Sequence, residues 1–238
     1  MSTFGAGAAQ ADTVGPAIKF FKSPLPVVGG VLSDSSGTPS LQMKDGWAVN
    51  DADGICSAYM NYYGSGARVW NAPQTGRTVT SLIGNTYTGT ARVGSYSYLQ
   101  GYGTDCLGNS SSSYHYWTPA LAQQGAASYS AGWTTSSGAV FSGGSVMYST
   151  KVGATATYSF SGTPLISLVS NKASNRGKVS ISVDGGTAKT VTLTASANSN
   201  RTVVYNSPYL TTNGSHLLTV KVVSGRVDID GFLTQYPY

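Results

Sequence analysis

The chain of 238 residues contains no glutamate, and all nine of its acidic residues are aspartate. It is rich instead in glycine, serine and threonine, with 30, 34 and 26 residues respectively. Glutamate is a good helix former, whereas threonine favours strands and glycine and serine favour turns. Hydrophobic residues at 40% supply enough apolar surface for a packed core, which argues against a disordered chain. The sequence therefore predicts an all-β globular protein and excludes a helical bundle or an alternating βαβ fold.

Alternating strand patterns recur in two cycles along the chain, and the texture changes between them around residues 119–132. Turn residues recur about every 8–12 positions, which is the spacing of a β-sandwich. We predict two β-sandwiches. A flexible leader over residues 1–11 precedes an immunoglobulin-like sandwich over 12–120, and a linker over 121–132 leads to a jelly roll over 133–238.

Three runs of the first half carry a family resemblance: DTVGP at 12–16, WAVNDADGI at 47–55 and YLQGYGTDCLGN at 98–109. With these runs the first half resembles the fibronectin type III-like domains that recur in actinobacterial extracellular proteins and in phages of those hosts. Such modules usually accompany an active partner, so the resemblance implies an architecture and no activity of its own.

Four runs of the second half are similar to the β-jelly roll that often follows such a domain. They are YSAGW at 129–133, GATATYSF at 153–160, NRGKVSISVDG at 175–185 and VDIDGF at 227–232. The two resemblances together cover nearly the whole chain from residue 12 onward.

The only cysteines are Cys56 and Cys106. In a fibronectin type III domain the predicted strands that hold them are neighbours in one sheet, so the resemblance favours a disulfide over two buried thiols. A disulfide implies that the protein works outside a reducing cytosol. A zinc site would need His115 and His216, which fall in different predicted domains.

Two pairs of aspartates are spaced for metal or acid–base chemistry. Asp51 and Asp53 resemble the opening of a calcium loop, but the later ligands are missing. Asp228 and Asp230 lie two apart on a predicted strand and would suit glycoside hydrolysis or calcium binding. The resemblance places this second pair in the terminal strand, where a structural role is expected. We find no nucleophile elbow, zinc-protease motif or phosphate loop, so the sequence predicts no catalytic residues, no metal, no cofactor and no enzymatic activity.

Sixteen tyrosines and four tryptophans are more aromatic side chains than two hydrophobic cores can bury, so several are expected at the surface. Exposed tyrosine and tryptophan rings stack on sugars and anchor interfaces. The predicted ligand-binding residues are Trp133, Tyr114 and Tyr116, together with Asn175 and Arg176 in a predicted loop. Packing between the two domains is the competing interpretation, and we favour it for Trp117 and Trp133.

The net charge of +5 arises entirely after residue 123, where eight basic residues face three aspartates. These basic residues form no cluster, and no apolar stretch reaches about 20 residues, so we expect neither nucleic-acid binding nor membrane insertion. Residues 1–16 lack the features of a signal peptide, so the chain is expected to be made in a cytoplasm without general secretory export.

These expectations together predict a non-catalytic phage virion protein, either a capsid decoration or a minor tail protein. It would attach to other virion proteins through its first sandwich and display the second toward a host-surface glycan. It would form a homo-oligomer and be localised in the virion, made in the host cytoplasm and active outside the cell. One alternative is a secreted or cell-surface bacterial glycan-binding accessory protein, and another is an intracellular binding module.

Overall fold

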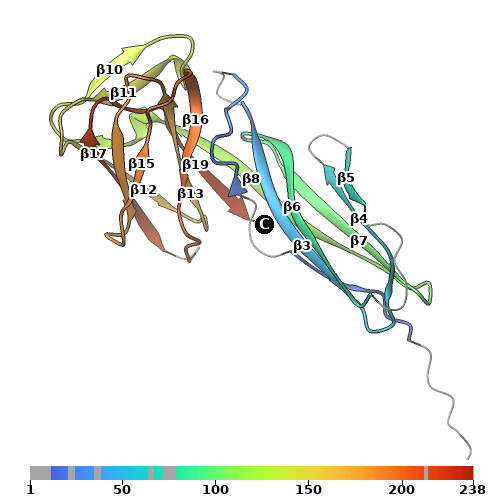
Figure 1. Ribbon diagram of the computed structural model, residues 1–238. Coiled ribbons are helices and arrows are strands. Elements are labelled where there is room, and N and C mark those ends of the chain that lie inside the picture. The colour runs from blue at the N-terminus through green and yellow to red at the C-terminus, as the bar shows by residue number, and fades with distance from the viewer. Residues whose placement is uncertain are drawn as a thin grey trace, which may run out of the picture.

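The computed structural model describes residues 12–20, 25–34, 39–63, 67–71, 79–211 and 214–237. These residues form β-strands and two short 3₁₀ turns, η1 (Gln124–Ala126) and η2 (Ser142–Gly144), and the described ranges contain no α-helix. The prediction of an all-β protein is therefore confirmed. The strands gather into two β-sandwiches side by side (Figure 1). The predicted leader over residues 1–11 lies outside the described residues.

The first half packs two antiparallel sheets face to face. One sheet has β3 (Ser40–Asn50) at its centre, with β6 (Ser81–Arg92) on one side and both β1 (Ala17–Phe20) and β2 (Leu25–Pro26) on the other. The facing strands are β5 (Ala67–Asn71), β4 (Ile55–Tyr63), β7 (Ser97–Asp105) and β8 (Ser110–Gln123), in that order. Alternating side chains of β3, β4 and β7 point inward and are buried, among them Trp47, Met60 and Leu99.

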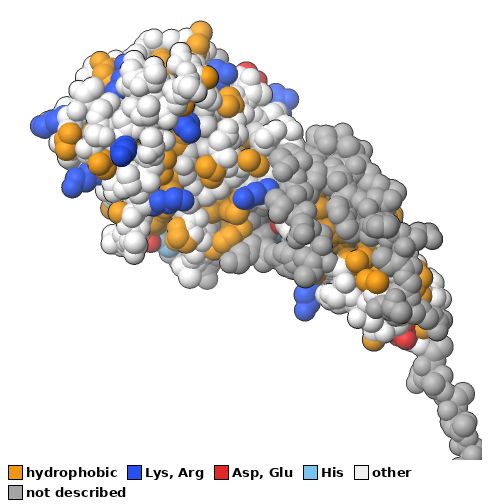
Figure 2. Space-filling model, viewed as in Figure 1, with side chains coloured by type: hydrophobic (Ala, Val, Ile, Leu, Met, Phe, Trp, Pro, Cys, Tyr) orange, Lys and Arg blue, Asp and Glu red, His pale blue; other side chains and the backbone are white. Residues whose placement is uncertain are grey.

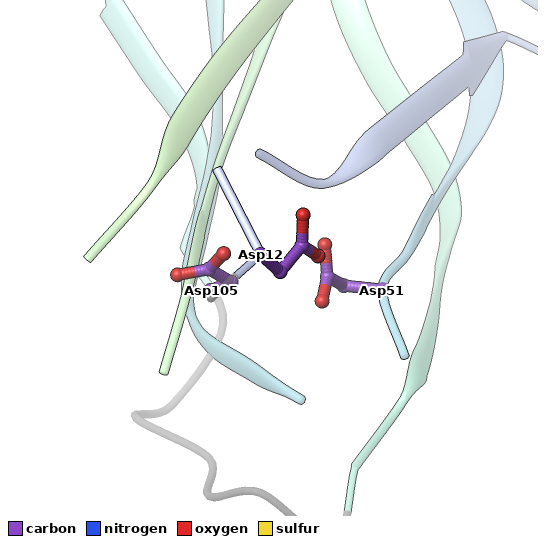
Figure 3. A group of neighbouring side chains, drawn as sticks. All are labelled: Asp12, Asp51 and Asp105. Carbon is purple, nitrogen blue, oxygen red and sulfur yellow. The ribbon is translucent and has the colours of Figure 1, made fainter. Parts of the chain in front are cut away.

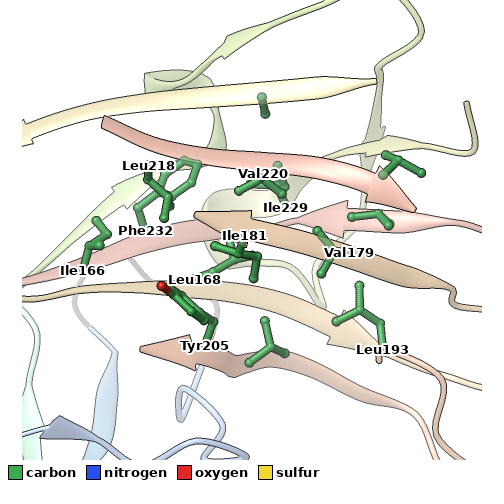
Figure 4. Close-up of a cluster of buried hydrophobic side chains, with 14 of the residues drawn as sticks. Ile166, Leu168, Val179, Ile181, Leu193, Tyr205, Leu218, Val220, Ile229 and Phe232 are labelled. Carbon is green, nitrogen blue, oxygen red and sulfur yellow. The ribbon is translucent and has the colours of Figure 1, made fainter. Parts of the chain in front are cut away.

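The second half is a jelly-roll-like β-sandwich, as predicted. Its five-stranded sheet runs in the order β15 (Lys189–Thr192), β14 (Lys178–Val183), β17 (Ser215–Ser224), β12 (Thr155–Ser161) and β9 (Ser128–Tyr129). The facing sheet contains β16 (Ser199–Asn206), β13 (Ile166–Lys172) and β19 (Gly231–Pro237). A small sheet of β10 (Thr134–Ser137), β11 (Ser145–Ser149) and β18 (Val227–Ile229) completes the half. Figure 4 shows the core between these layers, including Leu168, Ile181, Leu218 and Phe232.

Strand β8 belongs to both halves. Residues 110–117 pair with β7, and residues 117–123 pair with β19, so one seven-stranded sheet runs in the order β16-β13-β19-β8-β7-β4-β5. The interval 121–132, predicted as a linker, contains the end of β8, then η1 and β9. A continuous hydrogen-bonded sheet therefore passes from one sandwich to the other.

The two faces of this shared sheet supply two different cores. Val169, Val203 and Leu233 are buried in the core of the first half. Their chain neighbours Leu168, Val204 and Phe232 are buried in the core of the second half. Because successive side chains of a strand point to opposite faces, strands buried on both faces read as continuous apolar runs.

A segment from the first half also covers the edge of the shared sheet. The backbone N–H of Gly29 donates to the carbonyl of Val203 at 2.8 Å, and the N–H of Val203 donates to the carbonyl of Gly30 at 2.9 Å. The side-chain amide of Asn206 donates to the carbonyl of Pro26 at 2.8 Å. The outer edge of β16 is thus paired, which removes a site for unwanted strand addition.

Cys56 and Cys106 form a disulfide with a Cα separation of 4.9 Å. The bond joins the start of β4 to the turn after β7, where the N–H of Cys106 also donates to the carbonyl of Gly54. It therefore fastens one end of the first sandwich.

The shared sheet predicts cooperative unfolding of both halves. Replacing Leu233, a second-half residue in the first-half core, should cost about 2–5 kcal/mol and leave one thermal transition. Differential scanning calorimetry of Leu233→Ala measures this, with exposed Val152→Ala as the control. Two separate transitions in the unmodified protein would contradict it.

Removing the disulfide should lower the free energy of unfolding by about 3–4 kcal/mol, because the bond closes a long loop in the unfolded chain. Urea unfolding of the Cys56→Ser/Cys106→Ser double variant, compared with the oxidised protein, measures the loss. Equal stability of the two proteins would rule out this contribution.

Candidate functional site

Tyrosines line the outer face of the sheet of the first half. Along β7 and β8, Leu99 and Trp117 point into the core and are buried. The alternate positions, Tyr98, Tyr114 and Tyr116, therefore point to the opposite face. We define the tyrosine face as six residues of this surface: Tyr59, Tyr96, Tyr98, Tyr102, Tyr114 and Tyr116.

The rings of this face contact one another. Tyr114 and Tyr116 are nearly parallel, with centroids 5.6 Å apart and an interplanar angle of 3°. The ring centroids of Tyr98 and Tyr96 each lie 5.5 Å from the ring centroid of Tyr116. Cross-strand contacts of this kind stabilise a sheet and also hold the rings in fixed positions. The face is therefore a preorganised aromatic surface.

A polar side chain is set among the rings. The side-chain amide of Gln100 donates to the phenolic oxygen of Tyr114 at 2.6 Å, and Gln100 itself is only 5% exposed. Tyr96 and Tyr114 remain 50% and 44% exposed. Tyrosine combines an apolar ring with a hydroxyl group, so the surface offers stacking and hydrogen bonding without a formal charge on any of these residues.

The predicted ligand-binding residues fall in three places. Tyr114 and Tyr116 lie together on the tyrosine face. Trp133 packs on Tyr129, with ring centroids 5.2 Å apart, against the core of the second half. Asn175 and Arg176 lie in the turn between β13 and β14, where the guanidinium of Arg176 donates to Asn175.

The sequence-based prediction did not include Tyr59, Tyr96, Tyr98 and Tyr102. The period-two spacing of tyrosines at 96, 98, 114 and 116 was the available signal, because it places their rings on one face of a strand pair. Tyr59 joins them only through the pairing of β4 with β7, where it lies opposite Tyr102 with ring centroids 4.6 Å apart.

Asp228 is fully buried and bound by two arginines. Arg176 and Arg226 each donate to its carboxylate, the latter at 2.7 Å. The guanidinium of Arg226 also lies 4.0 Å above the ring of Tyr148. A buried carboxylate needs such partners, so Arg176 serves a structural ion pair in this structure.

Asp230 is also fully buried and has fewer partners. One carboxylate oxygen accepts the backbone N–H of Ser142 at 2.8 Å, and the other has no partner among the described residues. Burial raises the pKa of Asp230 to about 7, although the Ser142 hydrogen bond acts in the opposite direction. Neither Asp228 nor Asp230 is open to a substrate.

Three other aspartates meet at the far end of the first sandwich. The carboxylates of Asp12, Asp51 and Asp105 lie within 4.8 Å of one another (Figure 3). No spacing in the sequence predicted this grouping. Burial raises the pKa of Asp105, but hydrogen bonds from Asn109 and Leu107 outweigh it and leave the pKa below the ordinary value. The carboxylate of Asp105 thus stabilises the turn after β7 through these hydrogen bonds.

Both histidines are bound to carboxylates. Nδ1 of His115 lies 2.7 Å from Asp45, and Nδ1 of His216 lies 2.7 Å from Asp184. No serine in the described part of the chain is hydrogen-bonded to either imidazole, so this part shows no serine–histidine catalytic pair.

A small cavity lies beside the segment that covers β16. Its volume is about 280 Å³, and it is lined by residues of both halves: Val28, Gly29, Lys172, Val191, Thr192, Thr202, Val203 and Val204.

Lysine and arginine side chains are scattered singly over the visible face of the second half (Figure 2). The described ranges contain no helix with the length and hydropathy needed to cross a bilayer.

No protein-family model matches the chain, and no curated protein matches it. Among solved structures, it is similar to the Podospora anserina GH26-CBM35 β-(1,4)-mannanase, with 17% identity, a TM-score of 0.41 and coverage of 50% of this chain. The chain spans only 28% of that mannanase.

Two carbohydrate-binding modules are also similar to part of the chain. A family 6 carbohydrate-binding module has 17% identity and a TM-score of 0.38, covering 50% of this chain and 94% of the module. CsCBM6-3 from Clostridium stercorarium, in complex with cellobiose, has 18% identity and a TM-score of 0.36. The match covers 48% of this chain and 92% of the module.

The buried Asp230 predicts a loss of stability as the pH rises. Its pKa is higher in the folded chain than in the unfolded chain, so ionisation opposes folding and stability falls as the pH rises from about 4 to about 7. Asp230→Asn should remove this loss and be more stable than the unmodified protein at pH 8, by up to a few kcal/mol.

Urea unfolding at pH 5 and pH 8, in the presence of EDTA, measures the difference. Val152→Ala, which alters an exposed residue, is the control and should show the same dependence on pH as the unmodified protein. An Asp230→Asn variant that is less stable at pH 8 would show that the carboxylate is stabilising when ionised.

Proposed function

We propose that this chain is a non-catalytic glycan-binding protein and that the tyrosine face is its binding surface. The observation that carries the proposal is the fixed group of tyrosine rings, with Tyr96 and Tyr114 about half exposed and Gln100 set among them. The rings lie on the outer face of the sheet, whereas the core of the first sandwich lies on the other face, so they are not part of that core.

The chemistry of the surface suits a neutral sugar. A pyranose ring has apolar C–H faces that pack on aromatic rings, and its hydroxyls pair with phenolic hydroxyls and amides. The six tyrosines and Gln100 carry no charge at neutral pH, so the surface offers an acidic or basic sugar no ion pair. The preferred class of ligand is therefore a neutral glycan.

The absence of catalysis is supported by the state of the acidic residues. Glycoside hydrolysis needs two carboxyl groups that flank the substrate. Asp228 and Asp230 are buried, and Asp228 is neutralised by Arg176 and Arg226. Asp228 and Asp230, the pair whose spacing would suit glycoside hydrolysis, are thus buried within the second half.

We propose further that the first half is an immunoglobulin or fibronectin type III-like sandwich. When β1 and β2 are counted as one strand, the first, second and fifth strands form one sheet, and the third, fourth, sixth and seventh form the other. This order supports the assignment, since it is the Greek-key arrangement of that architecture.

The disulfide supports a site of action outside a reducing cytosol, as for a secreted or surface-bound glycan-binding protein. Attachment to a phage particle, localisation in a virion and homo-oligomerisation remain predictions from the sequence. Imaging of purified particles with an antibody against this chain tests them.

Binding to neutral polysaccharides should depend on the tyrosine face. Affinity electrophoresis in gels that contain soluble cellulose derivatives, xylan or mannan should show retardation of the unmodified protein by at least one of them. Tyr114→Ala and Tyr116→Ala should each weaken that binding about tenfold, or about 1.4 kcal/mol, because each removes a stacking ring.

Leu217→Ala is the matched control, since Leu217 is an exposed apolar residue of the second half. It should bind as the unmodified protein does. Migration that none of these polysaccharides changes, or Tyr114→Ala binding at full strength, would refute the proposed function.

A further inference from the structure

The sheet face that carries the tyrosine face does not end at β8. Along β8, Trp117 and Leu121 pack with the core of the first half, whereas Ala122 packs with the core of the second. By the same alternation, Thr118 shares its face with Tyr114 and Tyr116. The outer surface of the first sandwich and the core-facing surface of the second are therefore successive parts of one face.

Tyr236 continues the aromatic surface on the next strand. It lies opposite Thr118 in the pairing of β19 with β8, so its side chain points to the same face. It is 40% exposed. Its ring passes beside Gly162, where an added Cβ would lie 3.7 Å from it, so the turn after β12 leaves room for the ring.

Tyr158 on β12 packs against β19, the strand that carries Tyr236. Its ring stacks on Phe232 with centroids 4.4 Å apart and an interplanar angle of 5°. Burial raises the pKa of Tyr158, and the charge of an ionised Tyr236 raises it further. Aromatic side chains thus mark this face from β4 to β19.

This surface is too long for a single sugar ring to cover it. Strands β4, β7, β8 and β19 lie in sequence in one sheet, and three inter-strand steps of about 4.8 Å span about 14 Å. That distance exceeds one six-membered ring. Since β8 pairs with both neighbours, the two aromatic ends keep a fixed separation before any ligand binds.

We propose that a linear, neutral oligosaccharide binds along this face from the tyrosine face across β8 to Tyr236 and Tyr158, and so contacts both sandwiches at once. The inference rests on the proposed function and adds the class of ligand, an extended chain. Once one end of the chain is bound, contact at the other end is intramolecular, so affinity rises with chain length until the surface is filled.

Isothermal titration calorimetry with cello-, xylo- and manno-oligosaccharides of two, four and six residues tests this inference. For at least one series, the six-residue chain should bind at least tenfold more tightly than the disaccharide. Tyr236→Ala should remove most of that gain and leave disaccharide binding unchanged, whereas Tyr114→Ala should weaken both. Tyr236→Phe keeps the ring and should retain the gain, and the melting temperature of each variant reports its folding.

Equal affinity for two and six residues, or full six-residue affinity in folded Tyr236→Ala, would overturn the extended surface and leave the proposed function in place. No binding by any of the three series at any length would overturn both. The two failures are therefore distinguishable.

Discussion

The architecture depends on the pairing of one strand, β8, with a different partner along each part of its length. Its first eight residues pair with β7, and its last seven pair with β19. Because every strand alternates its side chains, this pairing assigns each residue of the shared sheet to one of two cores. Leu233 and Phe232 are neighbours in the chain, yet they are buried in different halves. The two sandwiches are thus joined by backbone hydrogen bonds as well as by apolar contacts.

The same pairing explains where aromatic residues reach solvent. The core of the second half extends across one face of the shared sheet as far as Ala122 on β8. Beyond β8 that face is the outer surface of the first half, and tyrosines occupy it in place of aliphatic residues. A tyrosine tolerates this boundary because its ring packs and its hydroxyl stays solvated. The proposed ligand surface is therefore a direct result of how far one sheet extends past the other.

Part of this arrangement is readable from the sequence. The lack of glutamate and the strand-forming composition indicate an all-β fold, and the cluster around Tyr114 and Tyr116 marks part of the aromatic surface. Local periodicity cannot specify which strands pair, because register over long separations depends on packing. The contacts of Tyr59 with Tyr102, of Asp12 with Asp105, and of Gly29 with Val203 all join residues far apart in the chain. The extension of β8 past residue 120 was missed for the same reason, since the change of texture around residues 119–132 suggested a linker.

The pairing of residues near position 30 with β16 has a consequence for synthesis on the ribosome. The first sandwich emerges long before its partners, because Val203 and the strand β19 lie far downstream of it in the chain. Until then β8 lacks one hydrogen-bonding neighbour, and the apolar side chains that Val169, Val203 and Leu233 later cover stay open to water. Contacts of such long sequence separation form slowly, and open strand edges invite association between nascent chains. A cell that makes this protein must keep its first half from aggregating until β19 has been made.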